Sequence, residues 1–143
     1  MGGLRVVPFA PAQLADLEPP VFCRGQLRDF AAAYRPAGPA FSLVEEGRVL
    51  GCAGLVLEGT RGRAWAFLSE SLRQRPFLLH RTVRRALPAL ARHYDLEIID
   101  AEAHADFAAA RQWLERLGFR HVETLPRFAG TTENYARYRL WVH

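Results

Sequence analysis

Cysteine is scarce in this chain, which contains only Cys23 and Cys52 among its 143 residues. Cys23 is expected in a loop that flanks a helix, and Cys52 in an inner strand. Two cysteines placed in this way do not supply the spaced set of a disulfide framework or of a cysteine-based metal cluster. We therefore interpret both as buried thiols and expect no metal centre.

Long hydrophobic runs are also missing. The longest apolar stretches, such as Val49 to Leu57, fall well short of the roughly 20 residues that cross a bilayer. Residues 1–5 lack the pattern of a secretory signal peptide. We therefore expect a cytoplasmic protein with no membrane partner.

Lysine is absent altogether, so the 19 residues counted as Lys or Arg are all arginines, and the net charge is +4. A basic balance favours anionic ligands such as nucleotide phosphates, nucleic acids or acidic protein surfaces. An arginine bias is equally typical of a GC-rich genome. Charge alone does not choose among these partners.

The remaining composition is that of a folded domain. Half of the residues (50%) are hydrophobic and 24% are charged, which is the balance of a globular chain rather than a disordered one. Domains cluster near roughly 100–150 residues, so a second domain has no room. We predict a single domain over residues 1–143, without an internal repeat or linker.

Hydrophobic periodicity predicts a mixture of strands and helices. Short apolar runs bounded by Gly and Pro indicate strands, and apolar positions three and four apart indicate helices. The expected strands are Leu4–Phe9, Phe41–Glu45, Arg48–Leu57, Arg63–Ser69, Leu96–Ala101, His121–Leu125 and Asn134–Val142. The expected helices are Pro11–Leu17, Arg24–Tyr34, Pro76–Tyr94 and Asp106–Leu117. Strands two to four are expected to form an antiparallel meander that starts with a hairpin.

Three residues have expected roles in the helices. Pro88 removes a backbone donor near the middle of the longest helix, so it either kinks that helix or divides it into two. Asp106 is expected to cap the last helix at its N-terminus. Gly118 is expected to end the same helix in the left-handed conformation, after which Phe119 returns to the core.

The order β-α-α-β-β-β-α-β-α-β-β resembles that of the GCN5-related N-acetyltransferases (GNAT) over essentially the whole chain. A sharper resemblance lies in the helix that contains Trp113 and closes with Leu117-Gly118-Phe119-Arg120, after a strand that ends in Asp100-Ala101-Glu102. The resemblance implies one α/β (α+β) domain with a central mixed, mostly antiparallel sheet flanked by helices.

A narrower resemblance is to short acetyltransferase-like proteins encoded by tailed phages and prophages. It rests on the hairpin Phe41–Leu57, the strand Ala64–Ser69, the basic helix segment His80–Arg85 and the tripeptide Ala105-Asp106-Phe107. It implies a protein of the host cytoplasm or of a virion, with phage structural proteins among its partners.

The family resemblance implies that acetyl-coenzyme A is the co-substrate. In the family, a glycine-rich loop after the fourth strand binds the pyrophosphate through backbone N–H groups and the helix dipole. The matching loop, Ser71–Phe77, lacks both usual glycines. Arg73 and Arg75 either compensate through their guanidinium groups or belong to a solvated surface loop. The expected cofactor-binding residues are Trp65, Phe67, Leu68, Arg73, Gln74, Arg75 and Phe77.

Acetyl transfer to an amine needs a base for the ammonium and an acid for the departing thiolate. By resemblance, Glu70 after the fourth strand and Glu102 at the exit of the fifth are the candidate catalytic residues. The aromatic residue before Leu-Gly-Phe is Trp113, which has no acidic hydroxyl. Tyr135 and Tyr138 are interpreted as packing residues. The pair His104 and Asp106 is interpreted as capping and surface residues rather than as metal ligands.

Two functions of different classes follow. The first is an enzyme that transfers an acetyl group from acetyl-coenzyme A to a primary amine of a small molecule, peptide or protein. The alternative is a catalytically inactive phage or prophage component that acts through protein contacts, as the missing glycines and Trp113 suggest. Nucleic-acid binding through Arg81, Arg84, Arg85 and Arg92 rests on charge alone, and we do not expect it.

Overall fold

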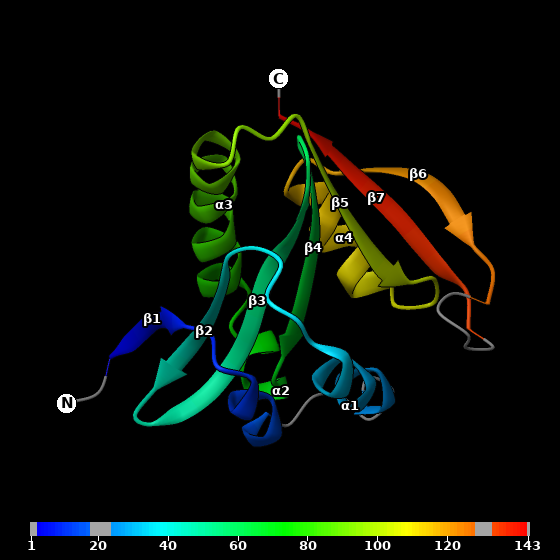
Figure 1. Ribbon diagram of the computed structural model, residues 1–143. Helices are drawn as coiled ribbons and strands as arrows, with labels where there is room; N and C mark the ends of the chain where they lie inside the picture. The colour runs from blue at the N-terminus through cyan, green and yellow to red at the C-terminus, as the bar shows by residue number, and fades with distance from the viewer. Residues whose placement is uncertain (1–2, 18–23, 128–132, 143) are drawn as a thin grey trace. The chain divides into compact units, whose positions relative to one another are not determined.

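A computed structural model describes residues 3–17, 24–127 and 133–142 (Figure 1). The strands are β1 (Leu4–Pro8), β2 (Ala40–Glu45), β3 (Arg48–Glu58), β4 (Arg61–Leu68), β5 (Ile98–His104), β6 (Arg120–Leu125) and β7 (Tyr135–Trp141). The helices are the 3₁₀ helix η1 (Pro11–Asp16), α1 (Arg24–Ala33), α2 (Glu70–Arg73), α3 (Pro76–His93) and α4 (Ala108–Arg116). The strands form one seven-stranded sheet in the order β1-β2-β3-β4-β5-β7-β6. The predicted α/β fold with a mixed, mostly antiparallel sheet is confirmed.

Contacts divide the chain into two compact units. The N-terminal unit contains Met1–Val56 and Trp65–Leu79, and the C-terminal unit contains Leu57–Ala64 and His80–His143. The boundary therefore passes through β4, between Ala64 and Trp65. The expectation of a single domain over residues 1–143 stays a prediction.

In the N-terminal unit, the predicted hairpin is confirmed. Strands β2 and β3 pair antiparallel, with Glu45 opposite Arg48, and β1 pairs antiparallel with β2. The turn residues Glu46 and Gly47 both have positive φ, of 51° and 77°. Two such residues make the tight turn whose twist matches that of the flanking strands.

An aromatic core fills one side of the N-terminal unit. Leu14 of η1, Leu27 of α1 and Cys52 of β3 are buried together. Five aromatic rings contact one another beside them, with centroid separations between 4.5 and 6.4 Å; these are Phe9, Phe30, Tyr34, Trp65 and Phe67. The helical segments are therefore held on the strands largely by aromatic packing.

Gly54 marks the tightest point of this packing. A Cβ atom at Gly54 would lie 2.6 Å from the carbonyl oxygen of Pro39 and 2.8 Å from the Trp65 ring. The same close approach allows the Leu55 N–H to donate to the Pro39 oxygen at 2.9 Å. The absence of a side chain on β3 thus makes room for Trp65.

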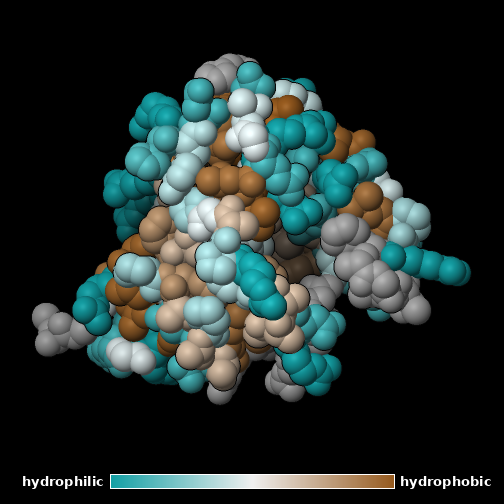
Figure 2. Space-filling view, in the orientation of Figure 1, coloured by the Kyte–Doolittle hydropathy of each residue, from teal (hydrophilic) through white to brown (hydrophobic). Residues whose placement is uncertain are grey.

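Apolar surface remains over β1 and β2, at the lower left of Figure 2. Val6 and Phe41 are 56% and 39% exposed. The register places Val6 opposite Leu43 and Pro8 opposite Phe41, on one face of the two strands. Strand β1 is the edge of the sheet at this end.

The C-terminal unit is built on β5. The first half of β4 pairs with β5 in parallel, and β7 pairs antiparallel with both β5 and β6. Ile99, Ala101 and Ala103 are buried on one face of β5, whereas Asp100 and Glu102 alternate with them on the other face. Helix α4 contacts β5 and β6.

Several predicted boundaries need correction. Helix α3 is one helix that contains Pro88, so the two-helix alternative is wrong. Strand β5 starts two residues later than predicted and continues to His104. Gly118, with φ of 101°, follows α4 as predicted. The predicted turn at residues 129–132 and the predicted loop cysteine Cys23 lie outside the described residues.

Asp106 does not cap α4. The helix starts at Ala108, and its cap residue is Phe107, which offers no side-chain acceptor. The Phe107 N–H donates to the His104 carbonyl oxygen at 2.9 Å, which closes a turn over Ala105 and Asp106. The Asp106 N–H donates to His104 Nδ1 at 3.1 Å. The helix therefore begins at Ala108, one residue later than a cap at Asp106 predicts.

Within the described parts of the chain, no helix is both long and apolar enough to cross a membrane.

Candidate functional site

Strand β4 loses its pairing with β5 halfway along its length. The parallel ladder joins Arg61–Ala64 to Ile98–Ala101, although β4 continues to Leu68 and β5 to His104. On its other side β4 is paired with β3, and in the described ladder with β5 residues 65–68 have no partner. The second half of β4 therefore presents one strand edge without a strand partner in the N-terminal unit.

Alternation along the strand identifies the backbone groups on this edge. The Ser69 N–H donates to the Leu50 carbonyl oxygen on β3 at 2.8 Å. Backbone polar groups of successive strand residues point to opposite edges, so the N–H groups of Ala66 and Leu68 lie on the edge away from β3. An edge of this kind can pair with an extended chain that carries amides.

The side chains of the predicted residues on β4 are largely committed to packing. The ring of Phe30 lies 4.5 Å from that of Trp65 and 5.1 Å from that of Phe67. Leu68 lies against Gly51, where a Cβ would be 3.1 Å from the leucine methyl group. At this edge, the groups that remain for a ligand are the backbone N–H and C=O groups of these residues.

The predicted loop Ser71–Phe77 is in fact mostly helical. Ser69 caps α2, because its Oγ accepts a hydrogen bond from the Leu72 N–H at 3.2 Å, and the Leu72 side chain is fully buried. Helix α3 then starts at Pro76. Only Gln74 and Arg75 separate the two helices.

The backbone donors of this segment are engaged within the protein. The N–H groups of Arg73, Gln74 and Arg75 donate to the carbonyl oxygens of Ser69, Glu70 and Leu72, at 3.1, 3.2 and 2.9 Å. Pro76 has no N–H. A cradle of backbone N–H groups, as the glycine-rich loop of the resembled family provides, is therefore not formed at residues 73–76.

Both predicted arginines form ion pairs with carboxylates. Arg73 Nη1 lies 2.9 Å from Glu70 Oε2, and Arg75 Nη1 lies 2.9 and 3.1 Å from the two carboxylate oxygens of Glu45. Exposed pairs of this kind contribute little, about 0.2–1 kcal/mol each. A phosphate group, which guanidinium groups also bind in a bidentate manner, can replace these partners at modest cost.

The other predicted residues of the segment are exposed. Gln74 is the C-terminal cap of α2. Phe77 lies on the first turn of α3 with 91% of its surface exposed, which is unusual for a phenylalanine in a folded chain. Beside the arginines it offers an aromatic face to a ligand.

The two candidate catalytic glutamates lie in different units. Glu70, in the N-terminal unit, has a side chain that is 59% exposed. Glu102, in the C-terminal unit, has a side chain that is 10% exposed, and its Oε1 accepts hydrogen bonds from Arg137 Nε and Nη2 at 3.3 and 3.1 Å. Their catalytic roles stay predictions.

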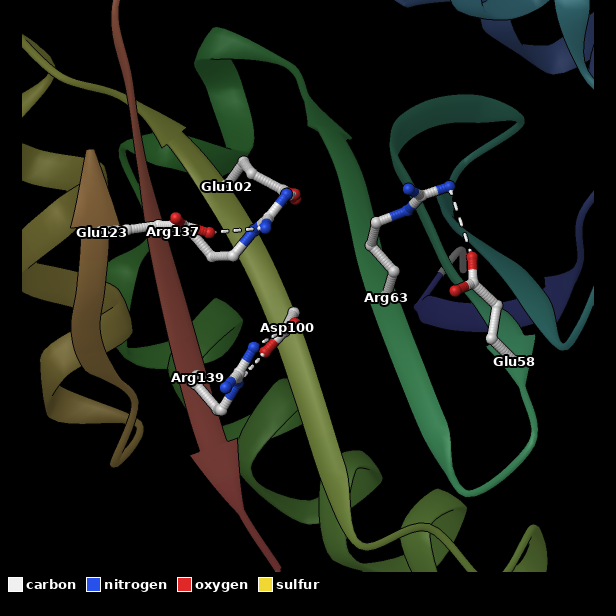
Figure 3. A network of polar contacts seen from close by, with 7 residues as sticks. All are labelled: Glu58, Arg63, Asp100, Glu102, Glu123, Arg137 and Arg139. Atoms are coloured by element: carbon white, nitrogen blue, oxygen red, sulfur yellow. Dashed lines mark hydrogen bonds and ion pairs between the residues drawn. The ribbon is translucent and has the colours of Figure 1, made fainter. Parts of the chain in front are cut away.

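Glu102 belongs to a charged face that the sequence did not predict (Figure 3). Asp100 and Arg139 form a forked pair, with Nε–Oδ1 at 2.7 Å and Nη2–Oδ2 at 3.1 Å. The hydrogen bonds that Arg139 donates to Asp100 raise the pKa of the Arg139 guanidinium. Arg137 also reaches Glu123, with Nη1–Oε1 at 2.7 Å. A cavity of about 170 Å³ opens on this face and is lined by Glu58, Arg61, Gly62, Arg63, Asp100, Glu102, Arg137 and Arg139.

Both tyrosines of β7 are buried, and their interpretation as packing residues stays a prediction. Tyr138 is 1% exposed, and its hydroxyl accepts from Arg111 Nε at 2.9 Å and donates to Glu115 Oε2 at 3.3 Å. Tyr135 is buried against the ring of His104, with centroids 5.3 Å apart. His104 Nε2 lies 2.9 Å from Glu133 Oε2.

No protein-family model and no curated protein sequence matches the chain. Solved structures do. A ribosomal-protein-S18-alanine N-acetyltransferase from Escherichia coli superposes with a TM-score of 0.74 at 14% identity, covering 98% of this chain and 94% of that one. Ard1 from Thermoplasma volcanium gives 0.74 at 15% identity, covering 98% of both chains. A spermidine N-acetyltransferase variant from Vibrio cholerae gives 0.70 at 12% identity, covering 97% and 94%.

At these identities the likeness concerns the fold. The chain has the fold of these N-acetyltransferases, as the order of its elements predicts. The narrower resemblance to phage and prophage proteins stays a prediction.

Proposed function

We propose that this chain, which has the fold of N-acetyltransferases, transfers an acetyl group from acetyl-coenzyme A to a primary amine. The observation that carries the proposal is the edge of β4 at residues 65–68, which continues past the end of the β5 ladder. The segment that follows it carries Arg73, Arg75 and the N-terminus of α3.

The residues present fit acetyl-coenzyme A through side chains and a strand edge rather than through a glycine-rich cradle. The amides of its pantetheine arm suit the N–H groups of Ala66 and Leu68. Arg73 and Arg75 exchange Glu70 and Glu45 for phosphate oxygens, and the dipole of α3 adds positive potential at Pro76. Phe77 provides a ring for the purine base. When bound, the cofactor supplies the activated thioester.

Glu70 is the candidate general base in the same unit as this strand edge. Its side chain is 59% exposed, and its Oε2 accepts a hydrogen bond from Arg73, which the carboxylate loses when Arg73 binds phosphate. Glu102 lies in the other unit, and its catalytic role stays a prediction.

The reaction balances with one base and one thiolate leaving group. The acceptor ammonium gives a proton to Glu70, and its nitrogen lone pair forms the bond to the acetyl carbon. The carbon–sulfur bond then breaks with its electron pair on sulfur. The nitrogen gives up a second proton as the amide forms, and the departing thiolate takes up a proton in its place. The similar structures act on spermidine in one case and on an alanine of ribosomal protein S18 in another. The acceptor is accordingly an amine-bearing small molecule or protein.

The alternative of a catalytically inactive phage component has weaker support. The missing glycines and Trp113 favour it, but the similar structures described above are N-acetyltransferases.

Calorimetric titration with acetyl-coenzyme A tests the proposal. We expect saturable binding that the double variant Arg73→Ala, Arg75→Ala weakens about tenfold or more, since two charge-assisted phosphate contacts are lost. The matched control Arg84→Ala, Arg85→Ala removes the same charge from exposed positions of α3 and should leave affinity nearly unchanged. Absence of binding at high micromolar cofactor would refute the proposal and favour the inactive alternative.

A further inference from the structure

The charged face of the C-terminal unit is arranged in columns. In the parallel ladder Arg63 lies opposite Asp100, and in the antiparallel ladder Arg139 and Arg137 lie opposite Asp100 and Glu102. Because every second residue of a strand faces the same side, Arg61 shares the face of Arg63. The two carboxylates of β5 therefore lie between an arginine column on β4 and another on β7.

The carboxylates of β5 accept hydrogen bonds from the arginine column on β7. Both oxygens of Asp100 accept from Arg139, and Oε1 of Glu102 accepts from Arg137. Figure 3 shows these two arginines directed at β5, whereas Arg63 is turned towards Glu58. The forked pair and the shared Arg137 fix the β7 side of the cavity.

The arginines of β4 have weaker partners. Arg63 Nη2 lies 3.9 Å from Glu58 Oε1, and both side chains are more than half exposed, at 52% and 64%. In the described residues, Arg61 has no ion pair within 4.0 Å and no side-chain hydrogen bond. The cavity lining contains four arginines and three carboxylates, so its surplus charge is positive and lies on the β4 side.

We infer that this cavity binds molecules that carry both an amine and a carboxylate. Arg61 and Arg63 hold the carboxylate through their planar N–H donors. Glu102 accepts a hydrogen bond from the ammonium. The inference concerns the C-terminal unit alone and does not rest on the proposed function.

Size and charge set the class of ligand that the cavity can take. A cavity of about 170 Å³ holds several waters at roughly 30 Å³ each, which is the scale of an amino acid or of one residue of a peptide. A polyamine would add positive charge to a cavity in which arginines already outnumber carboxylates. Like charges at this distance repel one another. Amino acids or acidic peptides are thus favoured over polyamines.

The inference is tested by NMR titration that follows the arginine Nε–Hε signals. The ligands are alanine, alaninamide and spermidine, since alanine and alaninamide differ only in the carboxylate. We expect alanine to shift the Arg61 and Arg63 signals saturably and to bind about tenfold more tightly than alaninamide, because one charge-assisted contact is at stake. The variant Arg61→Gln, Arg63→Gln should lose this preference, and the control Arg84→Gln, Arg85→Gln should keep it.

A preference for alanine over alaninamide that disappears in Arg61→Gln, Arg63→Gln supports the inference. Equal shifts and equal affinities with alanine, alaninamide and spermidine overturn it. Because the titration contains no cofactor, either outcome is independent of the proposed transferase.

Discussion

The two halves of strand β4, before and after the boundary between Ala64 and Trp65, differ in backbone pairing and in the character of their side chains. Before this point its backbone is paired with β5, and its side chains, Arg61 and Arg63, carry charge on the face of the sheet. After it, Trp65 and Phe67 are packed in an aromatic core, and the backbone edge away from β3 lacks a strand partner in the N-terminal unit. In the two proposals above, ligand recognition accordingly uses side chains in the first half of β4 and the backbone in the second.

This difference has consequences for mutation. Where side chains recognise a ligand, substitutions alter specificity and leave stability nearly unchanged. Where the backbone recognises it, the side chains hold the strand in place, so substitutions act first on stability. The experiments below examine each side of this contrast.

The largest effect is expected at Gly54, which accommodates Trp65. In Gly54→Ala the new Cβ meets the Pro39 oxygen and the Trp65 ring at 2.6 and 2.8 Å, and neither the carbonyl nor the packed indole can yield without moving the strand. We expect a loss of about 3 kcal/mol in the free energy of unfolding. Denaturant unfolding measures it. Gly3→Ala, where a Cβ meets nothing within 4 Å, is the control, and equal loss in both variants would contradict the packing account.

The contrast within β4 is sharpened by truncating neighbours of opposite type. Trp65→Ala removes a ring that contacts Phe9, Phe30, Tyr34 and Phe67, and we expect a loss of about 2–3 kcal/mol because the ring is only partly buried. Arg63→Ala, two residues earlier, should cost under about 0.5 kcal/mol. Both values come from the same unfolding experiment. Similar costs at the two positions would show that β4 has no such division.

How far the sequence predicts this molecule depends on the range of the interactions. The order of elements, the β2–β3 hairpin and the Gly118 helix end follow from local patterns, and the structure confirms them. Helix α2 was missed because it depends on one side-chain cap from Ser69 and on burial of Leu72, which no periodicity reveals. Asp106 was assigned as a cap because the turn closed by His104 is not visible from residue types.

The charged face was missed for a different reason. Asp100 and Glu102 on one strand, and Arg137 and Arg139 on another, share a spacing of two residues, which is a signal for one face of each strand. Their pairing depends on the antiparallel register of β5 and β7, which the sequence does not fix. Aligning the two segments antiparallel as oppositely charged columns would have found it.

A smaller effect is expected for the forked pair on the charged face. A double-mutant cycle on Asp100→Ala and Arg139→Ala should give a coupling free energy of about 1–2 kcal/mol, since both side chains are mostly buried and make two hydrogen bonds. The same cycle on Glu58 and Arg63, which are 3.9 Å apart and exposed, should give less than about 0.5 kcal/mol. An equally small coupling free energy for both pairs would contradict the claim that Arg139 is held by Asp100 more strongly than Arg63 is held by Glu58.

The smallest effect concerns Cys52 in the N-terminal core. Burial raises the pKa of the Cys52 thiol, and its hydrogen bond from Ser42 opposes this shift. The folded state thus keeps the proton at a pH where the unfolded chain loses it. This contribution to stability is complete below the unfolded pKa and is lost as pH rises towards the folded one. In a Cys23→Ser background, we expect slow alkylation of the native thiol at pH 9 and fast alkylation in denaturant. Rapid native alkylation would contradict the burial of Cys52.

Hydrogen exchange at single amides of β4, with and without acetyl-coenzyme A, tests the central claim most directly. The account predicts that the cofactor slows exchange at Ala66 and Leu68, whose N–H groups lie on the edge away from β3, and changes little at Arg61–Ala64, where the β5 ladder already exists. Saturable cofactor binding with unchanged exchange at Ala66 and Leu68 would contradict it, because the ligand would then lie elsewhere than along this strand.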